Sequence, residues 1–187
     1  MLKELLTTFV ISASASGVDV TPHDATQYLD KQATCLAKNM YYEARSQGLA
    51  GQLAVSLVVL NRVKDKRFPN TICEVIHQGP VRESWKTRGK DVAESERKYF
   101  PVKNRCQFSW YCDGKDDTPK NEKAWRKAQD VAFLVIYDKI KLDVTEGATH
   151  YHATYVKPSW AKTKTRTTRI EKHIFCCLLY TSPSPRD

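Results

Sequence analysis

The sequence predicts one mainly helical α+β domain, and three observations lead to this prediction. The chain has 187 residues, which is enough for one domain with a hydrophobic core. Apolar residues recur at helical spacing in the N-terminal third and again after residue 118. Residues 149–156 (THYHATYV) are rich in threonine, tyrosine and valine, which is typical of a strand. With 41% hydrophobic and 27% charged residues, the composition is that of a folded globular protein.

The first predicted helix covers residues 25–46. Its apolar residues, spaced by four and three, are Leu29, Ala33, Leu36 and Met40. Asp24 or Thr26 can cap the start of the helix. Gly48 suits the left-handed position that often follows a last helical turn. Residues 16–24 (SGVDVTPHD) are predicted to be a linker in front of this helix.

Glu43 lies on this helix where the apolar side turns inward. At about 100° per residue it projects close to Leu36 and beside Met40. Its helical neighbours include no cation that could pair with it. Burial without a partner raises the pKa of a carboxyl group, as a general acid near neutral pH requires. Glu43 is therefore the candidate catalytic acid. The alternatives are a surface glutamate on a frayed last turn or one that pairs with a distant arginine.

Two further helices are predicted in the middle of the chain. The first starts near Leu49, and Ser56 is its only polar residue from 53 to 60, so it should be buried almost all round. Asn61 shares the inner face of this helix and is predicted to brace a loop. Residues 71–78 (TICEVIHQ) form the second, which is short and is stopped by a Gly-Pro pair.

The sequence becomes irregular after this helix. The charged residues 81–103 are predicted to form an irregular insertion with a helical turn near residues 94–99. In residues 106–114 (CQFSWYCDG), polar and aromatic residues alternate, which favours an extended segment lining a groove. A last long helix is predicted after Thr118 and Pro119. Its inner face comprises Trp125, Ala128, Ala132, Val135 and Ile136.

The cysteines favour disulfides over a metal site. Four of the six lie within the predicted domain, and sequence alone leaves all three pairings open. They are Cys35, Cys73, Cys106 and Cys112. The chain has no Cys-x-x-Cys pair and no helical His-x-x-x-His, so no metal and no cofactor are expected.

Charge and the N-terminus bear on where the protein acts. Lysine and arginine outnumber aspartate and glutamate by 30 to 21, a net charge of +9 that attracts polyanions. From Trp160 to Lys172, five cations stand against one acid, as at a polyanion-binding edge or simply a solvated one. Residues 1–15 are similar to a secretory signal peptide with a small-residue cleavage site. No stretch is apolar for long enough to span a membrane, so no stable membrane insertion is expected.

Five motifs in order resemble the cell-wall hydrolase family that includes the catalytic domains of spore cortex-lytic enzymes. They are MYYEARSQGLAGQLAVSLVVLNRV, FPNTICEVIHQ, CQFSWYCDG, ATHYHATYVKPSW and IEKHIF, within residues 33–175. The resemblance implies a lysozyme-like or lytic-transglycosylase-like fold over residues 25–175. It also implies that the glutamate of the Tyr-x-Glu-Ala-Arg motif, here Glu43, is the catalytic acid.

The chain departs from the family pattern in three places. Family members often carry a second glutamate where this chain has Gln47, so a local carboxylate is missing. The charged insertion at 81–103 is longer than in the spore enzymes. The pattern stops after Phe175, and residues 176–187 (CCLLYTSPSPRD) are expected to be a non-native tail in which Cys176 and Cys177 have no structural role.

The resemblance implies cleavage of the β-1,4 bond between N-acetylmuramic acid and N-acetylglucosamine in peptidoglycan. Ordinary glycosidases use two carboxylates. Asp113, Asp116 and Asp117 lie in a polar loop that is typical of solvated surface, so a lytic transglycosylase with one carboxylate is the favoured mechanism. The candidate substrate-binding residues are Gln107, Ser109, Trp110, Tyr151 and His152. For Phe108 and Trp110, packing beneath the groove is the alternative to stacking on sugars.

The expected partner is the glycan strand of peptidoglycan, with no nucleic acid and with the protein as a monomer. Export to the periplasm or cell wall is expected, and the alternative is a phage-encoded enzyme made in the host cytoplasm. The competing function is a non-enzymatic basic module that binds cell-wall polymer or nucleic acid through exposed aromatic residues. That hypothesis does not explain why Glu43 faces inward.

Overall fold

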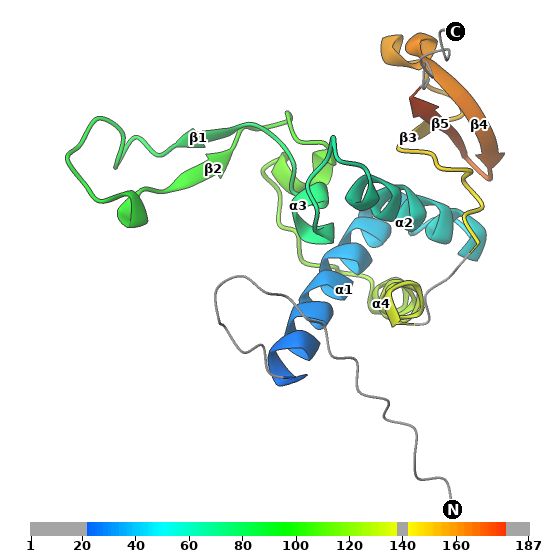
Figure 1. The fold of residues 1–187 in the computed structure, drawn as a ribbon, viewed down its shortest axis with the longest axis horizontal. Helices are drawn as coiled ribbons and strands as arrows, with labels where there is room; N and C mark the ends of the chain where they lie inside the picture. The colour runs from blue at the N-terminus through cyan, green and yellow to red at the C-terminus, as the bar shows by residue number, and fades with distance from the viewer. Residues whose placement is uncertain (1–21, 138–141, 179–187) are drawn as a thin grey trace, which may run out of the picture.

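The computed structural model describes residues 22–137 and 142–178, and it confirms the predicted α+β class (Figure 1). The helices are α1 (Pro22–Ala44), α2 (Leu49–Lys64), α3 (Ile72–Ile76) and α4 (Glu122–Tyr137). Short 3₁₀ helices are η1 (Glu94–Glu96), η2 (Ser109–Cys112) and η3 (Ser159–Thr163). Strands β1 (Val81–Glu83) and β2 (Tyr99–Pro101) form a hairpin. Strands β3 (His150–Ala153), β4 (Lys164–Ile170) and β5 (His173–Leu178) form an antiparallel sheet in the order β3-β5-β4.

Two hydrophobic clusters hold these elements together. The larger joins α1, α2, α3 and α4 with the aromatic residues of 108–111. The smaller joins α2 to the three-stranded sheet and comprises Ala54, Val58, Ala148 and Phe175. Tyr151 on β3 packs against both clusters. The sheet therefore meets the helical body along α2, with Tyr151 at the boundary.

The junction between α1 and α2 differs from the prediction. Helix α1 starts at Pro22, so three residues assigned to the linker are helical, whereas residues 16–21 lie outside the described part of the chain. Gly48 does not adopt the left-handed conformation: its φ is −68°, and it is the N-cap of α2. A Cβ at this position would meet the Glu171 carboxylate at 2.7 Å. Gly48 is therefore close-packed against the Glu171 side chain and does not supply a left-handed backbone conformation.

Helix α2 confirms the prediction of a helix that is buried almost all round. Its buried residues include Ala54, Val58 and the polar Ser56, whose hydroxyl donates to the Gln52 carbonyl at 3.0 Å. The Asn61 amide donates to Asp143, Thr145 and Ala148, at 2.8, 3.2 and 3.1 Å. Asn61 thus braces the loop in front of β3, as predicted.

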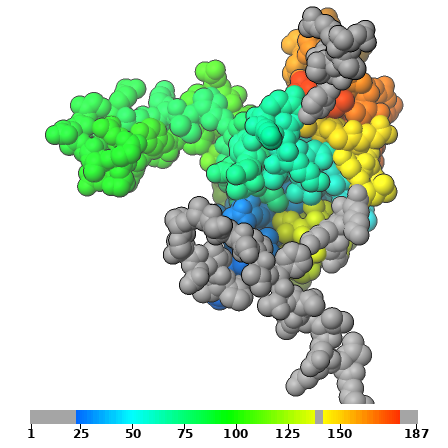
Figure 2. Space-filling model, viewed as in Figure 1, coloured from blue at the N-terminus to red at the C-terminus, as the bar shows by residue number. Residues whose placement is uncertain are grey.

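Residues 81–103 are more regular than predicted. Strands β1 and β2 pair from Val81↔Pro101 to Glu83↔Tyr99, and η1 lies between them. Figure 2 shows that this segment, which we call the hairpin arm, projects from the rest of the molecule. The strands could not be predicted from the sequence because they are short and their residues are mostly exposed on both faces.

The two disulfides of the described residues join Cys35 to Cys73 and Cys106 to Cys112. The first ties α1 to α3, and the second closes a small loop that contains η2. This loop is not the extended segment that alternation predicted. In a 3₁₀ turn, alternate residues do not point to opposite faces as they do in a strand. Phe108 and Trp110 are nevertheless both buried, at 3% and 8% exposure.

The expectation that Cys176 and Cys177 have no structural role is wrong. Strand β5 continues to Leu178, and Cys176 is 2% exposed in the core. Its carbonyl accepts a hydrogen bond from the Thr149 backbone at 3.1 Å, and Cys177 pairs with Thr165 on β4. Both cysteines therefore complete the sheet. Residues 179–187 lie outside the described part of the chain.

Helix α4 buries the predicted inner face against α1. Ala128, Val131, Ala132 and Val135 are buried, and Trp125 is half-buried. Across the described residues, none of the helices combines the length and the apolarity that crossing a membrane requires.

The cap on α2 can be tested by replacing Glu171 with alanine. The Glu171 carboxylate accepts hydrogen bonds from the backbone of Gly48 at 2.9 Å and of Gly51 at 3.1 Å. Loss of a helix cap costs about 1 kcal/mol, so we expect the melting temperature to fall by a few degrees in thermal unfolding. Glu146→Ala is the control because Glu146 is also exposed and has a similar positive φ, 56° against 48°. An equal loss in both variants would assign the effect to the backbone and not to the cap.

Candidate active site

Glu43 lies in the last turn of α1, partly buried, where the helical body meets β3. The Tyr151 hydroxyl donates a hydrogen bond to Glu43 Oε2 at 3.0 Å. Side chains alternate along β3, so Tyr151 faces Glu43 and the α2 side of the sheet, whereas His150 and His152 face the other side. The structure thus brings together two of the predicted site residues from segments that are 108 positions apart.

Burial raises the pKa of Glu43 above its ordinary value, and this desolvation is the largest influence on the group. The hydrogen bond from Tyr151 and the positive charge of Arg62 act in the opposite direction. Burial also raises the pKa of Tyr151 well above its usual range, so its hydroxyl stays protonated and acts as a donor. The pKa of Glu43 is therefore raised by desolvation, while Tyr151 and Arg62 limit that rise by favouring the carboxylate.

Arg62 is the cation of this site. It is 2% exposed on α2, and its Nε donates to the Thr149 carbonyl at 2.7 Å. Its guanidinium lies over the rings of Phe68 and Phe108, 5.3 and 5.4 Å from their centroids. Burial lowers the pKa of Arg62 to about 10, so it stays charged at neutral pH. The charge faces Glu43 and Tyr151 without forming a direct ion pair with either.

The sequence analysis allows for a distant arginine near Glu43 but does not identify Arg62, because helical periodicity relates Glu43 only to residues on its own helix. The signal was present in the second helix, where an arginine follows a long apolar run and lies one turn beyond residue 58, on the buried side. Buried arginines require partners. Those partners come from three other segments, and their positions depend on the tertiary fold.

Gln107 is placed beside this arginine. With its amide oxygen turned toward Arg62, Gln107 accepts from both terminal guanidinium nitrogens, at 3.2 and 3.3 Å. Its backbone donates to the Gln78 carbonyl at 2.8 Å. Ser109 is exposed at the start of η2, two residues further on. Gln107 therefore belongs to the surroundings of Glu43 through Arg62, and Ser109 lies on the same loop.

Two of the predicted substrate-binding residues are placed differently from expectation. Trp110 packs in the core: its indole Nε1 donates to Asn39 Oδ1 at 3.0 Å, and its ring stacks on Tyr42 at a centroid distance of 4.8 Å. Its ring face is thus already occupied by protein. His152 points away from Glu43 and lies edge-on to Trp160 at 5.7 Å.

No acidic side chain is among the groups that shift the Glu43 pKa. Hydrogen bonds within their own loop lower the pKa of Asp113 and of Asp116, and both behave as surface carboxylates. Asp117 differs from the prediction of a solvated loop: it is partly buried, and desolvation raises its pKa. Gln47, at the position where the family often has glutamate, is buried and uncharged, with its amide nitrogen 2.9 Å from His173 Nδ1. Among the described residues, no other carboxylate therefore affects the pKa of Glu43.

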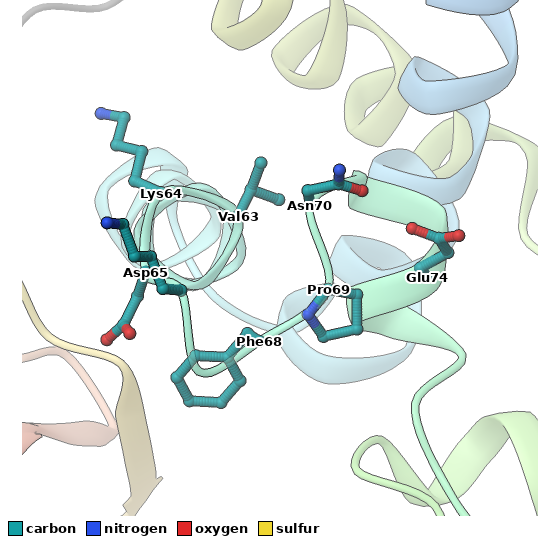
Figure 3. Close-up of a pocket in the computed structure, with 8 residues that line it drawn as sticks. Val63, Lys64, Asp65, Phe68, Pro69, Asn70 and Glu74 are labelled. Carbon is teal, nitrogen blue, oxygen red and sulfur yellow. The ribbon is translucent and has the colours of Figure 1, made fainter.

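The described residues contain no group of three His, Cys, Asp or Glu side chains that could hold a metal ion. A hollow of about 690 Å³ lies between the end of α2 and the start of α3 (Figure 3). Its lining includes Phe68, which also covers Arg62. None of the residues around it hydrogen-bonds to Glu43 or Tyr151. The hollow therefore has no direct hydrogen bond to the Glu43 site and adjoins it through Phe68 and Arg62.

The fold and this site define a lysozyme-like domain built around one partly buried glutamate. The family model for cell wall hydrolases matches residues 46–176, about 70% of the chain. The chain belongs to the cell wall hydrolase family. The matched residues begin three positions after Glu43, so the family model by itself does not assign the glutamate.

The chain is also similar to spore cortex-lytic enzymes. It is 27% identical over 151 residues to the one from Halalkalibacterium halodurans and 28% identical to the one from Bacillus cereus, over 80% of this chain in each case. It spans only 36% and 45% of the length of these relatives.

Two solved structures have the same fold. They are the catalytic domain of the Bacillus cereus SleB protein and the catalytic domain of the germination-specific lytic transglycosylase SleB from Bacillus anthracis. Each is 26% identical to this chain with a TM-score of 0.50. The first match covers 87% of this chain and 100% of that domain, and the second covers 78% and 93%.

Tyr151→Phe tests the hydrogen bond at the centre of the site. The bond from Tyr151 lowers the pKa of Glu43, so its removal should raise that pKa further. Carboxyl-carbon NMR titration of Glu43 measures the change directly. Tyr28→Phe is the control because Tyr28 is an exposed tyrosine on α1. A Glu43 pKa that is unchanged or lower in Tyr151→Phe would show that the bond does not stabilise the carboxylate.

Proposed function

We propose that this chain cleaves the β-1,4 bond between N-acetylmuramic acid and N-acetylglucosamine in peptidoglycan, as a lytic transglycosylase with Glu43 as its catalytic residue. The observation that supports this most directly is a partly buried carboxyl group whose pKa is raised by desolvation. A general acid near neutral pH needs this property. Membership of the cell wall hydrolase family and likeness to a catalytic domain named as a lytic transglycosylase support the substrate and reaction.

The reaction uses Glu43 twice. In the first step the protonated carboxyl group gives its proton to the glycosidic oxygen, and the bond from that oxygen to the muramoyl C1 breaks. In the second step the Glu43 carboxylate takes the proton of the muramoyl 6-hydroxyl, whose oxygen bonds to C1 and closes a 1,6-anhydro ring. No water is consumed. Hydrolysis would ordinarily require a second carboxylate to act as nucleophile or to activate water.

Tyr151 and Arg62 support the carboxylate that exists between the two steps. Once Glu43 has given up its proton, its carboxylate lies in a desolvated position that would be costly without partners. The hydroxyl of Tyr151 and the charge of Arg62 both favour this anionic form. Arg62 is a positioning residue because its donors are used by Thr149 and Gln107.

The substrate would lie over Glu43 with Gln107 and Ser109 at one side. Both are exposed on the loop closed by the Cys106–Cys112 disulfide. A disulfide-bonded domain that acts on peptidoglycan fits an exported protein. We therefore propose that it acts in the periplasm or the cell wall.

Glu43→Gln tests the catalytic assignment. The amide keeps the shape of the side chain but cannot give a proton, so we expect clearing of cell-wall suspensions to slow by about a hundred-fold or more. The melting temperature should stay close to that of the wild type because packing is preserved. Glu146→Gln, at an exposed turn, is the control and should clear walls at the normal rate. A Glu43→Gln variant that retains more than about a tenth of the wild-type rate would refute the assignment.

The products distinguish the two possible reactions. Mass spectrometry of peptidoglycan digested by the wild-type chain should show 1,6-anhydromuramic ends, which lack one water relative to hydrolysis products. Reducing muramic ends would show a hydrolase instead. No released fragment at all would reject the proposed cleavage.

A further inference from the structure

The hairpin arm (residues 81–103) is fixed at its base beside the Glu43 site. The Val102 backbone donates to the Pro80 carbonyl at 2.9 Å, and that of Gln107 donates to Gln78 at 2.8 Å. A Cβ on Gly79 would meet Cys106 Cα at 2.9 Å, so the two chain segments touch there. The disulfide-closed loop that carries Gln107 therefore anchors the arm, which then projects away from the helical body (Figures 1 and 2).

Ion pairs and hydrogen bonds order the arm internally. They also neutralise some of its negatively charged side chains. Arg97 forms ion pairs with Glu83 at 2.8 Å and with Glu94 at 3.2 Å. Tyr99 donates to the second oxygen of Glu94 at 3.0 Å. The Ser84 backbone donates to the Lys98 carbonyl at 2.7 Å and continues the ladder beyond the strands. Two glutamates and one arginine are thus used to build the arm.

One hollow of the arm is lined mainly by apolar and cationic side chains, and its one acid, Glu83, is already paired with Arg97. Trp85 is 74% exposed and Phe100 is 56% exposed. They line this hollow of about 640 Å³ together with cations from both sides of the hairpin, Arg82, Lys86, Arg88 and Lys98. Within the described residues none of these four cations forms an ion pair. Lys86 instead lies 5.7 Å from the Trp85 ring centroid.

Exposing such a surface to water costs free energy, and no contact among the described residues explains why it is exposed. Exposed tryptophan gains free energy when its face is covered, and tryptophan and arginine are over-represented where binding energy concentrates. Unpaired arginines suit carboxylate ligands, which they bind through two parallel hydrogen bonds. Peptidoglycan presents both features, because its sugars have apolar C–H faces and its stem peptides carry carboxylates.

We propose that the hairpin arm is a second peptidoglycan-binding surface, separate from the Glu43 site, in which Trp85 stacks on a sugar and Arg82, Arg88 and Lys98 bind stem-peptide carboxylates. This inference rests on the proposed function for the identity of the polymer. The arm holds the insoluble wall while the Glu43 site cuts a strand. It contributes affinity for the wall and takes no part in bond cleavage.

Sedimentation with insoluble peptidoglycan tests the arm, in a Glu43→Gln background that leaves the wall undigested. Trp85→Ala, and separately Arg88→Ser with Lys98→Ser, should weaken the apparent affinity by about ten-fold at low salt. The matched control is Lys123→Ser with Lys127→Ser, which removes the same charge from exposed positions on α4. Thermal unfolding checks that each variant is folded. Equal wall binding by the arm variants and the α4 control would overturn the inference.

Two further measurements separate this inference from the proposed function. With Glu43 intact, the arm variants should cleave a short soluble peptidoglycan fragment at the wild-type rate, because such a fragment reaches only the Glu43 site. A parallel loss of that cleavage would overturn a purely wall-holding role. Vesicles rich in phosphatidylglycerol, and double-stranded DNA, test other polyanions as the ligand of the arm. The inference would also be overturned if the arm variants lost binding to either of these but bound the wall as the wild type does. Wall binding that depends on Trp85, without any released fragment, would reject the cleavage and retain the arm.

Discussion

The structure depends on keeping one carboxyl group desolvated and yet hydrogen-bonded. Glu43 lies at the boundary of two hydrophobic clusters, and Tyr151, which packs against both, provides its hydrogen bond. If the sheet were displaced from α2, water would reach Glu43. The hydrogen bond from Tyr151 would be lost at the same time. A carboxyl group buried without this bond would be more costly and more fully protonated. The contact between α1 and β3 is therefore the constraint to which the packing of the sheet must conform.

The junction between α1 and α2 positions Glu43 through contacts that come from the far end of the chain. Glu171, in the turn between β4 and β5, accepts from the first backbone N–H groups of α2, and Gln47 bonds to His173 just beyond it. These contacts fix where α1 ends, because the segment between Ala44 and Leu49 is too short to move independently. Helix α2 then carries Arg62 on its inner face, where its charge acts on Glu43. The short segment between α1 and α2 thus links the three-stranded sheet to both Glu43 and Arg62.

Much of this arrangement could be predicted from local patterns. The inward position of Glu43, the buried second helix and the bracing role of Asn61 follow from helical periodicity, which depends only on neighbouring residues. Contacts between distant residues could not be predicted in this way. Gly48 faces a carboxylate that is 123 positions away, and Arg62 is surrounded by rings from two other segments. The loop from Cys106 to Cys112 alternates like a strand, but its disulfide pairing, which sequence left open, closes it into a turn. The family motifs end at Phe175 and so predict that Cys176 belongs to a tail, although its backbone completes β5.

The balance of influences on Glu43 bears on why one carboxylate is enough for the proposed reaction. A single group that acts first as acid and then as base must be stable in both protonation states within one catalytic cycle. Desolvation alone would favour the protonated form and hinder release of its proton in the first step, whereas a direct ion pair would favour the carboxylate, remove its proton too early and weaken it as a base. Here desolvation is the larger effect, and a neutral hydroxyl and an unpaired but nearby arginine oppose it. Because Arg62 is held by Thr149, by Gln107 and by two aromatic rings, its charge acts at a distance and cannot close onto Glu43. The protein thus stabilises both forms of one glutamate by limiting how strongly each partner can favour either.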